Sequence, residues 1–281
     1  MTLALREGER QQFAASRIVA DWPAPLNVHA ISTLRGPAGD SQPPFEHLNL
    51  GARNGDDLSN VMLNRNGLSF HLELPPPHWL RQVHGNTVVR FDRPAPHVPY
   101  RENREQHARM VAAEPQADAA ITQTPDVALA ILTADCLPVL FCADDDCEIA
   151  AAHAGWRGLS AGVLENTLAA MRSSRENILA WLGPAIGSRS YEVGDEVRDA
   201  FLTQDPQAAA AFAATRPGHW HCDLYALARQ RLCTAGVTRI FGGGFDTFAD
   251  PRFYSYRRDG ARSGRFATLI WSSPSRSHDA E

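Results

Sequence analysis

The stretch VALAILTADCLPVLFCADDDCEIAAAHAGWRG, residues 127–158, decides the fold that we expect for this chain of 281 residues. It opens with a nearly continuous apolar run at 127–132, which is typical of a strand buried on both faces. Residues 139–142 resemble a second strand, the acidic residues 143–146 indicate a turn, and residues 148–153 resemble a third strand. The central stretch therefore predicts three successive strands, the first of them buried on both faces.

Strands and helices alternate in the rest of the chain. Residues 28–34 alternate between apolar and polar and predict a strand, and Asp56 and Asp57 indicate the acidic start of a short helix that includes Arg65. Capping and periodicity predict further strands at 87–91, 237–241, 253–256 and 266–271, and helices at 160–171, around 193–201 and over 224–232. This order of elements predicts an α/β or mixed α+β layered fold in a single domain, and the hairpins among the strands favour mixed sheets. The compact sandwich form of this fold is implied only by the family resemblance given below.

The ends of the chain and one internal segment differ from this pattern. We expect residues 1–27 to be an N-terminal extension, residues 28–271 to form a single domain, and residues 272–281 to be a polar tail. Residues 93–116 are rich in charge and contain proline, which predicts an exposed loop or insertion and not a part of the core.

Composition excludes several classes of function. The net charge is −5 and the pI is about 6.1, so no electrostatic reason exists to expect binding to nucleic acid or to an anionic membrane. Residues 1–20 lack the apolar segment of a signal peptide, and no apolar run is long enough for a spanning helix. The five cysteines do not suggest a disulfide framework, so we expect reduced thiols and a cytoplasmic location.

Three residues stand in unusual local contexts. His84 lies in RQVHGN, Cys136 in TADCLP and His153 in AHAGWRG. Two imidazoles and one thiolate suit zinc and leave one coordination position open. Their wide spacing is unlike that of a zinc finger, but each follows or ends a predicted strand beside glycine or proline. The residues alone leave two interpretations open: a metal site, or one buried cysteine with two structural histidines.

Two segments could bind an anion. Residues 155–158, GWRG, lead into a predicted helix, whose N–H groups together with Arg157 would attract phosphate. Residues 257–265 contain four arginines and two glycines, and bidentate contacts from these could hold phosphate or carboxylate. The alternatives are a tight turn with a surface arginine and a solvated hairpin loop.

Other combinations of metal-binding or redox residues are weaker. His219, His221 and Cys222 follow a Pro–Gly pair, and we interpret them as a surface connection. Cys142 and Cys147 bracket the acidic turn, where a redox pair is conceivable but is not required. The sequence has no P-loop, no dinucleotide-binding glycine motif, no Gly-x-Ser-x-Gly and no His-Glu-x-x-His.

Six short segments, in this order, give the chain a family resemblance: NLG (49–51), WLRQVHG (79–85), TADCLPV (133–139), HAGWRG (153–158), LGPAIG with YEVG (182–194) and SYRRDG (255–260). With them, residues 28–271 resemble the multicopper polyphenol oxidase (laccase-like) domain family. That family is also described as zinc-dependent purine nucleoside phosphorylases and as peptidoglycan editing factors.

The resemblance implies that His84, Cys136 and His153 bind zinc, with copper less favoured. It also implies a monomeric α/β sandwich that phosphorolyses adenosine, inosine and methylthioadenosine, with adenosine deamination as a second activity. The positions that resemble the surroundings of the family's active site are Arg35, Asn49, Arg65, Asp135 and Arg258. One departure is Arg53, at a place where relatives often carry histidine.

The leading hypothesis is metal-assisted attack on a purine nucleoside, with phosphate as the second substrate. In this hypothesis Asp135, Cys136 and Arg258 are catalytic, with Asp135 as proton carrier, and Arg35, Asn49, Arg65 and Arg157 bind substrate or phosphate. Three alternatives remain. The first is an amidase that removes a mis-incorporated amino acid from a peptidoglycan precursor, the second is a copper-dependent phenol oxidase, and the third is a non-enzymatic, zinc-stabilised binding domain.

Overall fold

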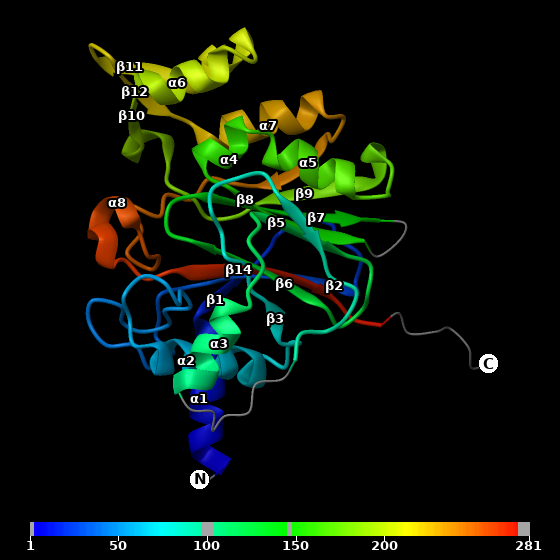
Figure 1. Ribbon diagram of the computed structural model, residues 1–281, viewed down its shortest axis with the longest axis vertical. Coiled ribbons are helices and arrows are strands. Elements are labelled where there is room, and N and C mark those ends of the chain that lie inside the picture. Colours follow the sequence, from blue (N-terminus) through cyan, green and yellow to red (C-terminus); the bar gives the residue numbers. More distant parts are fainter. Residues whose placement is uncertain (1–2, 97–103, 145–147, 275–281) are drawn as a thin grey trace, which may run out of the picture.

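The computed structural model describes residues 3–96, 104–144 and 148–274, and two sheets lie face to face at its centre (Figure 1). The five-stranded sheet has the order β1 (Arg17–Val19), β2 (Val28–Thr33), β14 (Phe266–Ser272), β6 (Ala128–Thr133), β3 (Pro77–His78). The six-stranded sheet has the order β13 (Arg239–Gly242), β9 (Ile178–Leu182), β7 (Leu137–Ala143), β8 (Ile149–Ala154), β5 (Ala119–Thr122), β4 (Val88–Arg90). Both sheets combine parallel and antiparallel pairs.

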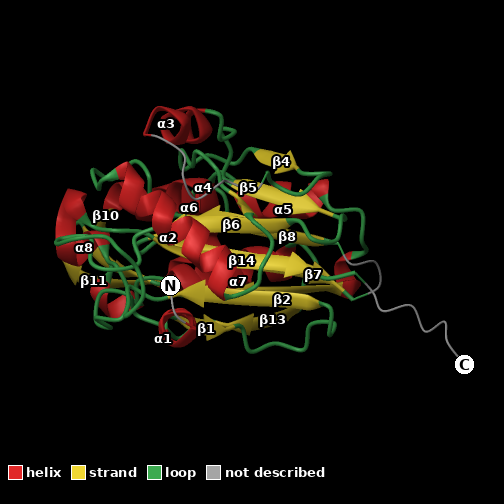
Figure 2. Ribbon diagram, turned by 90° about the horizontal axis from the view of Figure 1, so that it is seen from below, coloured by secondary structure: helices red, strands yellow, loops and turns green. Residues whose placement is uncertain are grey.

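Helices cover the outer face of each sheet, which gives four layers (Figure 1). On the outer side of the five-stranded sheet lie α1 (Leu3–Ala15), α2 (Leu58–His71) and α3 (Arg104–Ala112). On the outer side of the six-stranded sheet lie α4 (Trp156–Ser160), α5 (Val163–Ala170) and α7 (Leu224–Thr234). Seen from the α1 side, the strands of both sheets run across the molecule in similar directions (Figure 2).

A smaller antiparallel sheet of β10 (Glu192–Gly194), β12 (His219–Cys222) and β11 (Phe212–Arg216) projects at one end of the molecule with α6 (Asp195–Leu202) (Figure 1). The short helix α8 (Tyr256–Asp259) lies at the same end as β10, near the ends of the two large sheets (Figure 1). Within the described ranges, short 3₁₀ turns are present at Arg175–Asn177, Ser188–Ser190, Pro206–Ala211 and Gly260–Arg262.

The central strands are apolar along their whole length because both of their faces are covered. All seven residues of β7 and all six of β8 are buried. One face of the six-stranded sheet packs on the five-stranded sheet through Leu140, Ile149 and Ile131, and the other packs on α5 and α7. The strands predicted at residues 127–132, 139–142 and 148–153 are present and buried, but the first of them, β6, belongs to the five-stranded sheet and the other two to the six-stranded sheet. The mixed α+β layered fold is confirmed.

The prediction of an exposed loop at residues 93–116 holds for residues 93–96, which are irregular and mostly exposed, and is wrong for the conformation of residues 104–112. Residues 104–112 form α3, which contacts α2, and His107 is buried. Beyond the helix, the buried carboxylate of Glu114 forms ion pairs with Arg53 and Arg65. The many charged residues of this segment suggested exposure to solvent, but the charge of Glu114 is neutralised by its ion pairs. Residues 97–103 lie outside the described residues.

Two other sequence interpretations need correction. Residues 253–256, predicted as a strand, are an irregular segment that ends in α8, where Ser255 caps the helix by accepting a hydrogen bond from the Arg258 N–H. Phe253 and Tyr254 are fully buried. Their apolar side chains therefore indicated that the segment is buried, but not that its backbone is a strand. Residues 219–222, interpreted as a surface connection, form β12, the middle strand of the small sheet.

The remaining predicted elements are present with shifted ends. The helix predicted over 160–171 is divided into α4 and α5 at Gly162, which has φ +87°. The segment before Val28 holds α1 and β1, and β1 pairs with β2 at the edge of the five-stranded sheet. Among the residues that the structure describes, none of the helices is both long enough and apolar enough to span a bilayer.

The packing between the layers predicts a large cost for truncating β7. Phe141 is fully buried and belongs to the cluster under α5 and α7, so Phe141→Ala should lower the free energy of unfolding by about 3–5 kcal/mol. Urea denaturation followed by circular dichroism would measure this. Phe70→Ala is the matched control, because Phe70 is 64% exposed, and its loss should be far smaller. Equal losses in the two variants would contradict this account of the core.

Candidate metal site

The structure brings His84, Cys136 and His153 together. One ligand atom from each lies within 4.8 Å of the other two, and Cys136 Sγ is 3.8 Å from His84 Nε2. Among the described residues this is the one group of three or more His, Cys, Asp or Glu side chains close enough to hold a metal ion. The group therefore has the donors and the spacing for a three-ligand site with an open position.

Each ligand lies where a strand of the six-stranded sheet begins or ends. Residues 134–136 cross from β6 in one large sheet to β7 in the other, and Cys136 is the last residue of this crossing. His153 lies in β8 directly opposite Pro138 of β7. His84 lies in the loop before β4, and this loop is fastened to β6 because the Gln82 amide exchanges two hydrogen bonds of 2.8 Å with the backbone of Leu132.

The carboxylate of Asp118 connects two of the ligands. Asp118 is fully buried, and its Oδ1 accepts hydrogen bonds from His84 N and from His153 Nδ1, both at 2.9 Å. Its Oδ2 accepts a 2.7 Å hydrogen bond from Gly85 N. Occupying His153 Nδ1 leaves Nε2 to face Cys136 and a metal ion, which is the usual outer-shell arrangement for a metal-binding histidine.

The same contacts shift the protonation equilibria of the site. Burial by itself would raise the pKa of the Cys136 thiol, but hydrogen bonds and charge from His153 and His84 lower it to about 6. Burial by itself would lower the pKa of His153, but hydrogen bonds to Asp118 and Cys136 raise it. Cys136 is thus poised as a thiolate, the form that binds a metal ion.

Two glycines of the GWRG segment leave room for the ligands. A Cβ atom at Gly155 would lie 2.9 Å from Cys136 Sγ and 3.2 Å from His84 Cδ2. A Cβ atom at Gly158 would lie 2.7 Å from the carbonyl oxygen of Gly85. Their role is therefore to let α4 approach the ligand loop closely, in addition to any role in binding an anion.

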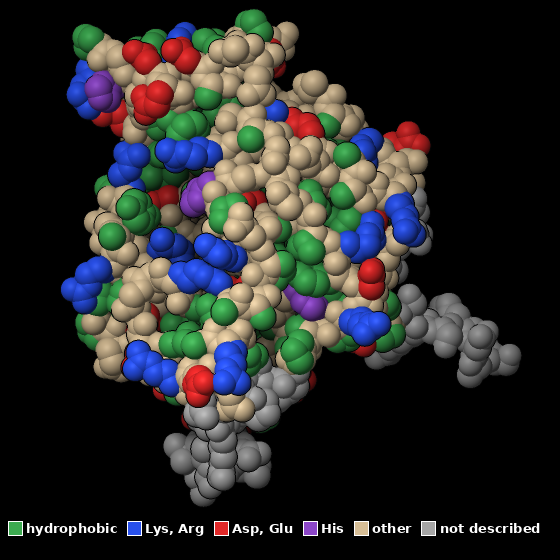
Figure 3. Space-filling view, in the orientation of Figure 1, with side chains coloured by type: hydrophobic (Ala, Val, Ile, Leu, Met, Phe, Trp, Pro, Cys, Tyr) green, Lys and Arg blue, Asp and Glu red, His purple; other side chains and the backbone are tan. Residues whose placement is uncertain are grey.

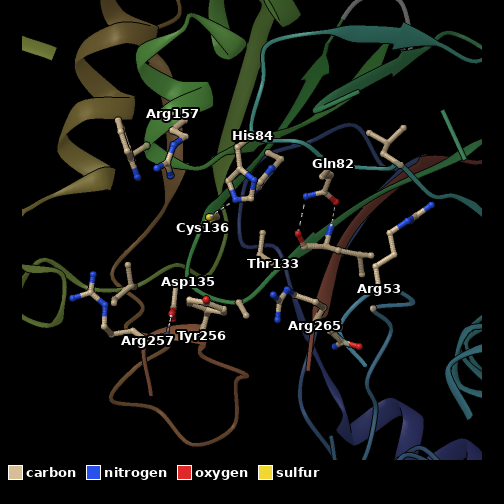
Figure 4. A pocket seen from close by; sticks show the side chains of 18 of the residues that line it. Arg53, Gln82, His84, Thr133, Asp135, Cys136, Arg157, Tyr256, Arg257 and Arg265 are labelled. Carbon is tan, nitrogen blue, oxygen red and sulfur yellow. Dashed lines mark hydrogen bonds between the residues drawn. The ribbon is translucent and has the colours of Figure 1, made fainter. Parts of the chain in front are cut away.

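The ligands open into a cavity of about 600 Å³ (Figure 4). Arg53, Arg157, Arg257 and Arg265 line it together with a single carboxylate, that of Asp135. Figure 3 shows basic side chains gathered around a hollow on this face of the molecule. The excess of arginine indicates a cavity for anionic groups.

Of the residues selected from the sequence, Asp135, Cys136, Arg157 and the two histidine ligands line this cavity. Asp135 is held on both oxygens: Oδ1 accepts a hydrogen bond from the Thr247 hydroxyl and Oδ2 one from Arg257 N, each at 2.7 Å. Asp135 and His84 also have positive φ angles, of +93° and +60°. Such backbone conformations are uncommon for these residue types and occur often at functional sites.

The other four selected residues are not among the residues that line the cavity. Asn49 is buried, and Arg35 pairs with Glu46. Arg65 pairs with Glu114 and stacks over Trp79. Arg258 donates hydrogen bonds to the carbonyl oxygens of Thr247, Phe248 and Phe253 and so holds that loop together. A role for these four in binding substrate or in catalysis stays a prediction.

Sequence reasoning missed Asp118, Gln82 and the separate importance of Arg265. The signal that could have indicated Asp118 is a lone carboxylate inside the apolar run 117–121. Arg265 had been noted only as a member of the arginine-rich segment 257–265. His219 and His221 form no metal-binding group with their described neighbours. Cys142 is buried and free, whereas Cys147, its suggested redox partner, lies outside the described residues.

The hydrogen bonds of Asp118 predict that it strengthens metal binding. Asp118→Asn should weaken the affinity for zinc by about 10–100-fold, because the negative charge is lost and one of the two oxygens that accept from His153 and the His84 loop becomes an NH2 donor. Titration against a chelating dye would measure the affinity. Asp92→Asn is the control, because Asp92 is exposed. The zinc affinity of this variant should equal that of the wild type. An unchanged affinity in Asp118→Asn would refute this role.

The close approach of α4 predicts that Gly155 cannot be enlarged without damage to the site. Gly155→Ala should lower zinc affinity, because the new methyl group displaces the Cys136 sulfur or the His84 ring. Gly8→Ala, where a Cβ meets nothing within 4 Å, is the control. The same dye titration, with a thermal melt to check folding, would measure the effect. Wild-type affinity in Gly155→Ala would show that the ligands move aside freely.

Curated relatives are similar to this chain over nearly its whole length. A "Purine nucleoside phosphorylase" of Xylella fastidiosa is 53% identical over 267 residues, which cover 92% of this chain and 98% of that protein. "Purine nucleoside phosphorylase YfiH" of Escherichia coli is 48% identical over 256 residues, which cover 90% of this chain and 98% of that protein.

Solved structures share the fold. A crystal structure of a Neisseria meningitidis protein has a TM-score of 0.82 and 43% identity, covering 92% of this chain and all of that chain. The structure of YlmD from Geobacillus stearothermophilus has a TM-score of 0.76 and 31% identity, covering 89% of this chain and 93% of that one. Residues 28–273 match the family described as "Multi-copper polyphenol oxidoreductase laccase", and the chain belongs to that family.

Proposed function

We propose that this protein is a zinc-dependent purine nucleoside phosphorylase, with adenosine deamination as a second activity. The observation that carries the proposal is the His84–Cys136–His153 group at the wall of an arginine-lined cavity of about 600 Å³. A cavity of this size can hold a nucleoside with phosphate. The printed names of the relatives in Xylella and Escherichia support the same activity.

The donor set favours zinc over copper. One thiolate and two imidazoles with an open position match catalytic zinc sites. Copper sites of similar composition add a weak axial ligand, often methionine, and the described lining of the cavity contains no methionine. A bound zinc ion would supply Lewis acidity for an oxygen of the substrate or of water. Metal analysis of the purified protein would measure which metal it holds.

The residues of the chain would bind and orient the two substrates. The Arg157 guanidinium stacks over the Trp156 ring at 4.3 Å and lines the cavity beside the ligands, where it can bind phosphate. Leu80, Leu132 and Ile186 provide apolar wall for a purine base. Holding phosphate and the nucleoside in one cavity reduces the entropic cost of bringing them together.

Asp135 is our candidate for the proton carrier. Its two oxygens each accept one hydrogen bond from the protein, but a carboxylate has about four acceptor positions, so it can still receive a proton from a substrate. The two hydrogen bonds hold it next to Cys136 at the cavity wall. This restraint suits a group that must meet the substrate in one geometry.

The proposal predicts that Cys136 is essential. Cys136→Ala should reduce phosphate-dependent release of adenine and ribose 1-phosphate from adenosine by more than about 100-fold, because the metal site loses its thiolate. Product analysis of the zinc-loaded protein would measure it. Cys233→Ala, at an exposed free cysteine, should keep wild-type activity.

The same incubation separates the competing activities. Ribose 1-phosphate that forms only with phosphate supports phosphorolysis, and inosine that forms without phosphate supports deamination. Full phosphorolysis by metal-free Cys136→Ala protein, or neither product from the wild type, would refute the proposed function. The amidase alternative would then be tested by mass spectrometry of muropeptide precursors in a deletion strain.

A further inference from the structure

The charge in the cavity exceeds what one inorganic phosphate needs. Four arginines line it against one carboxylate, and only Arg53 among the four forms an ion pair with a carboxylate in the described residues, that of Glu114. Arg257 donates from its guanidinium to the carbonyl oxygen of Glu192 and stacks over Tyr191. Three guanidinium groups therefore face the cavity without a carboxylate partner among the described residues.

Arg265 is the most firmly held of these three. Its Nη1 donates hydrogen bonds to the carbonyl oxygens of Ser263 and Gly264, both at 2.8 Å. Among the described residues, no hydrogen bond from Nε or Nη2 is present, so these donors remain for a ligand. Burial lowers the pKa of Arg265, which shows that its charge is poorly solvated and would gain from an anionic partner.

The Asn49–Gly51 turn positions Arg265. The buried Asn49 side chain accepts hydrogen bonds from Arg265 N at 2.8 Å and from Gly51 N at 3.0 Å. A Cβ atom at Gly51 would lie 2.7 Å from Cγ of Arg265, so glycine is needed for the arginine stem to pass. This contact is made by the buried Asn49 side chain and the Gly51 backbone, and it holds the residue whose guanidinium lines the cavity.

Arg265 lies away from the other two unpaired arginines. Figure 4 shows Arg157 and Arg257 on one side of Cys136 and Arg265 on the other, near Thr133. A phosphate held by Arg157 and Arg257 would thus lie on the other side of Cys136 from Arg265. The cavity therefore offers two anion positions, and the second is available to the other substrate.

We propose that Arg265 binds a phosphoryl group carried by the nucleoside itself, so that nucleoside monophosphates are ligands of this site. The inference rests on the proposed function for the identity of the nucleoside. Phosphate is the chemistry that a fixed guanidinium with two remaining donor nitrogens recognises. Inorganic phosphate would occupy the position beside Arg157 and Arg257.

Isothermal titration of the full, zinc-loaded chain with AMP and with adenosine tests the proposal. We expect AMP to bind at least about tenfold more tightly, the gain from one charge-assisted contact. Arg265→Gln should remove this preference. Arg172→Gln should retain it, because Arg172 is exposed and is not among the described residues that line the cavity. Equal affinities for AMP and adenosine in the wild type would overturn the proposal.

A second arm distinguishes the two sources of phosphate. In saturating inorganic phosphate the preference for AMP should persist, since the two anions occupy different positions. Loss of the preference would show that AMP uses the inorganic phosphate position, which overturns the inference about Arg265. Adenosine phosphorolysis is assayed separately. If AMP binds with the expected preference but adenosine is not phosphorolysed, the proposed function is wrong and the anion position at Arg265 is still supported.

Folding is controlled with a conservative variant. Arg265→Lys keeps the positive charge and should retain part of the preference for AMP, with a melting temperature close to that of the wild type. If both variants lose the preference and melt at much lower temperatures, Arg265 serves the fold alone and the proposal is wrong.

Discussion

The site depends on one buried carboxylate. Asp118 has no exposed surface, and its oxygens accept hydrogen bonds from the backbone of residues 83–85 and from the ring of His153. A buried charge of this kind is tolerable only when its acceptor positions are filled. The requirement to fill them fixes the position of one ligand loop and the orientation of one ligand ring together. The Asp118 carboxylate thus both positions the candidate ligands and raises the pKa of His153.

The two-sheet architecture provides the rest of the arrangement. The chain crosses from the five-stranded to the six-stranded sheet at residues 134–136, and Cys136 ends that crossing. Gln82 binds the backbone of the strand that enters the crossing, so the loop carrying His84 is attached to both sheets. The two sheets pack through a close, largely apolar interface, and this packing helps to set the distances between the candidate ligands.

Around the ligands, buried polar groups direct positive charge into a confined space. Asn49, selected from the sequence as a contact to substrate, instead orders the turn that holds Arg265. Arg258 similarly joins loop carbonyls beside Asp135, whereas Arg157 keeps its guanidinium in the cavity. The residues selected from these separate segments thus divide into those that line the cavity and those that support the lining, and both kinds are needed for a fixed anion site.

The sequence by itself indicated the layered fold and the three candidate ligands, which the structure brings together. Periodicity and apolar runs indicate which residues are buried. The six short segments indicated the family, although the candidate metal ligands are widely spaced in the sequence. It could not determine the conformation of residues 253–256 or the helix within 93–116, because apolar or charged character indicates environment and not backbone geometry. Only the tertiary structure revealed Asp118 and Arg265, whose partners lie far away in the chain. Their roles arise from contacts between separate elements, and no local pattern encodes such contacts.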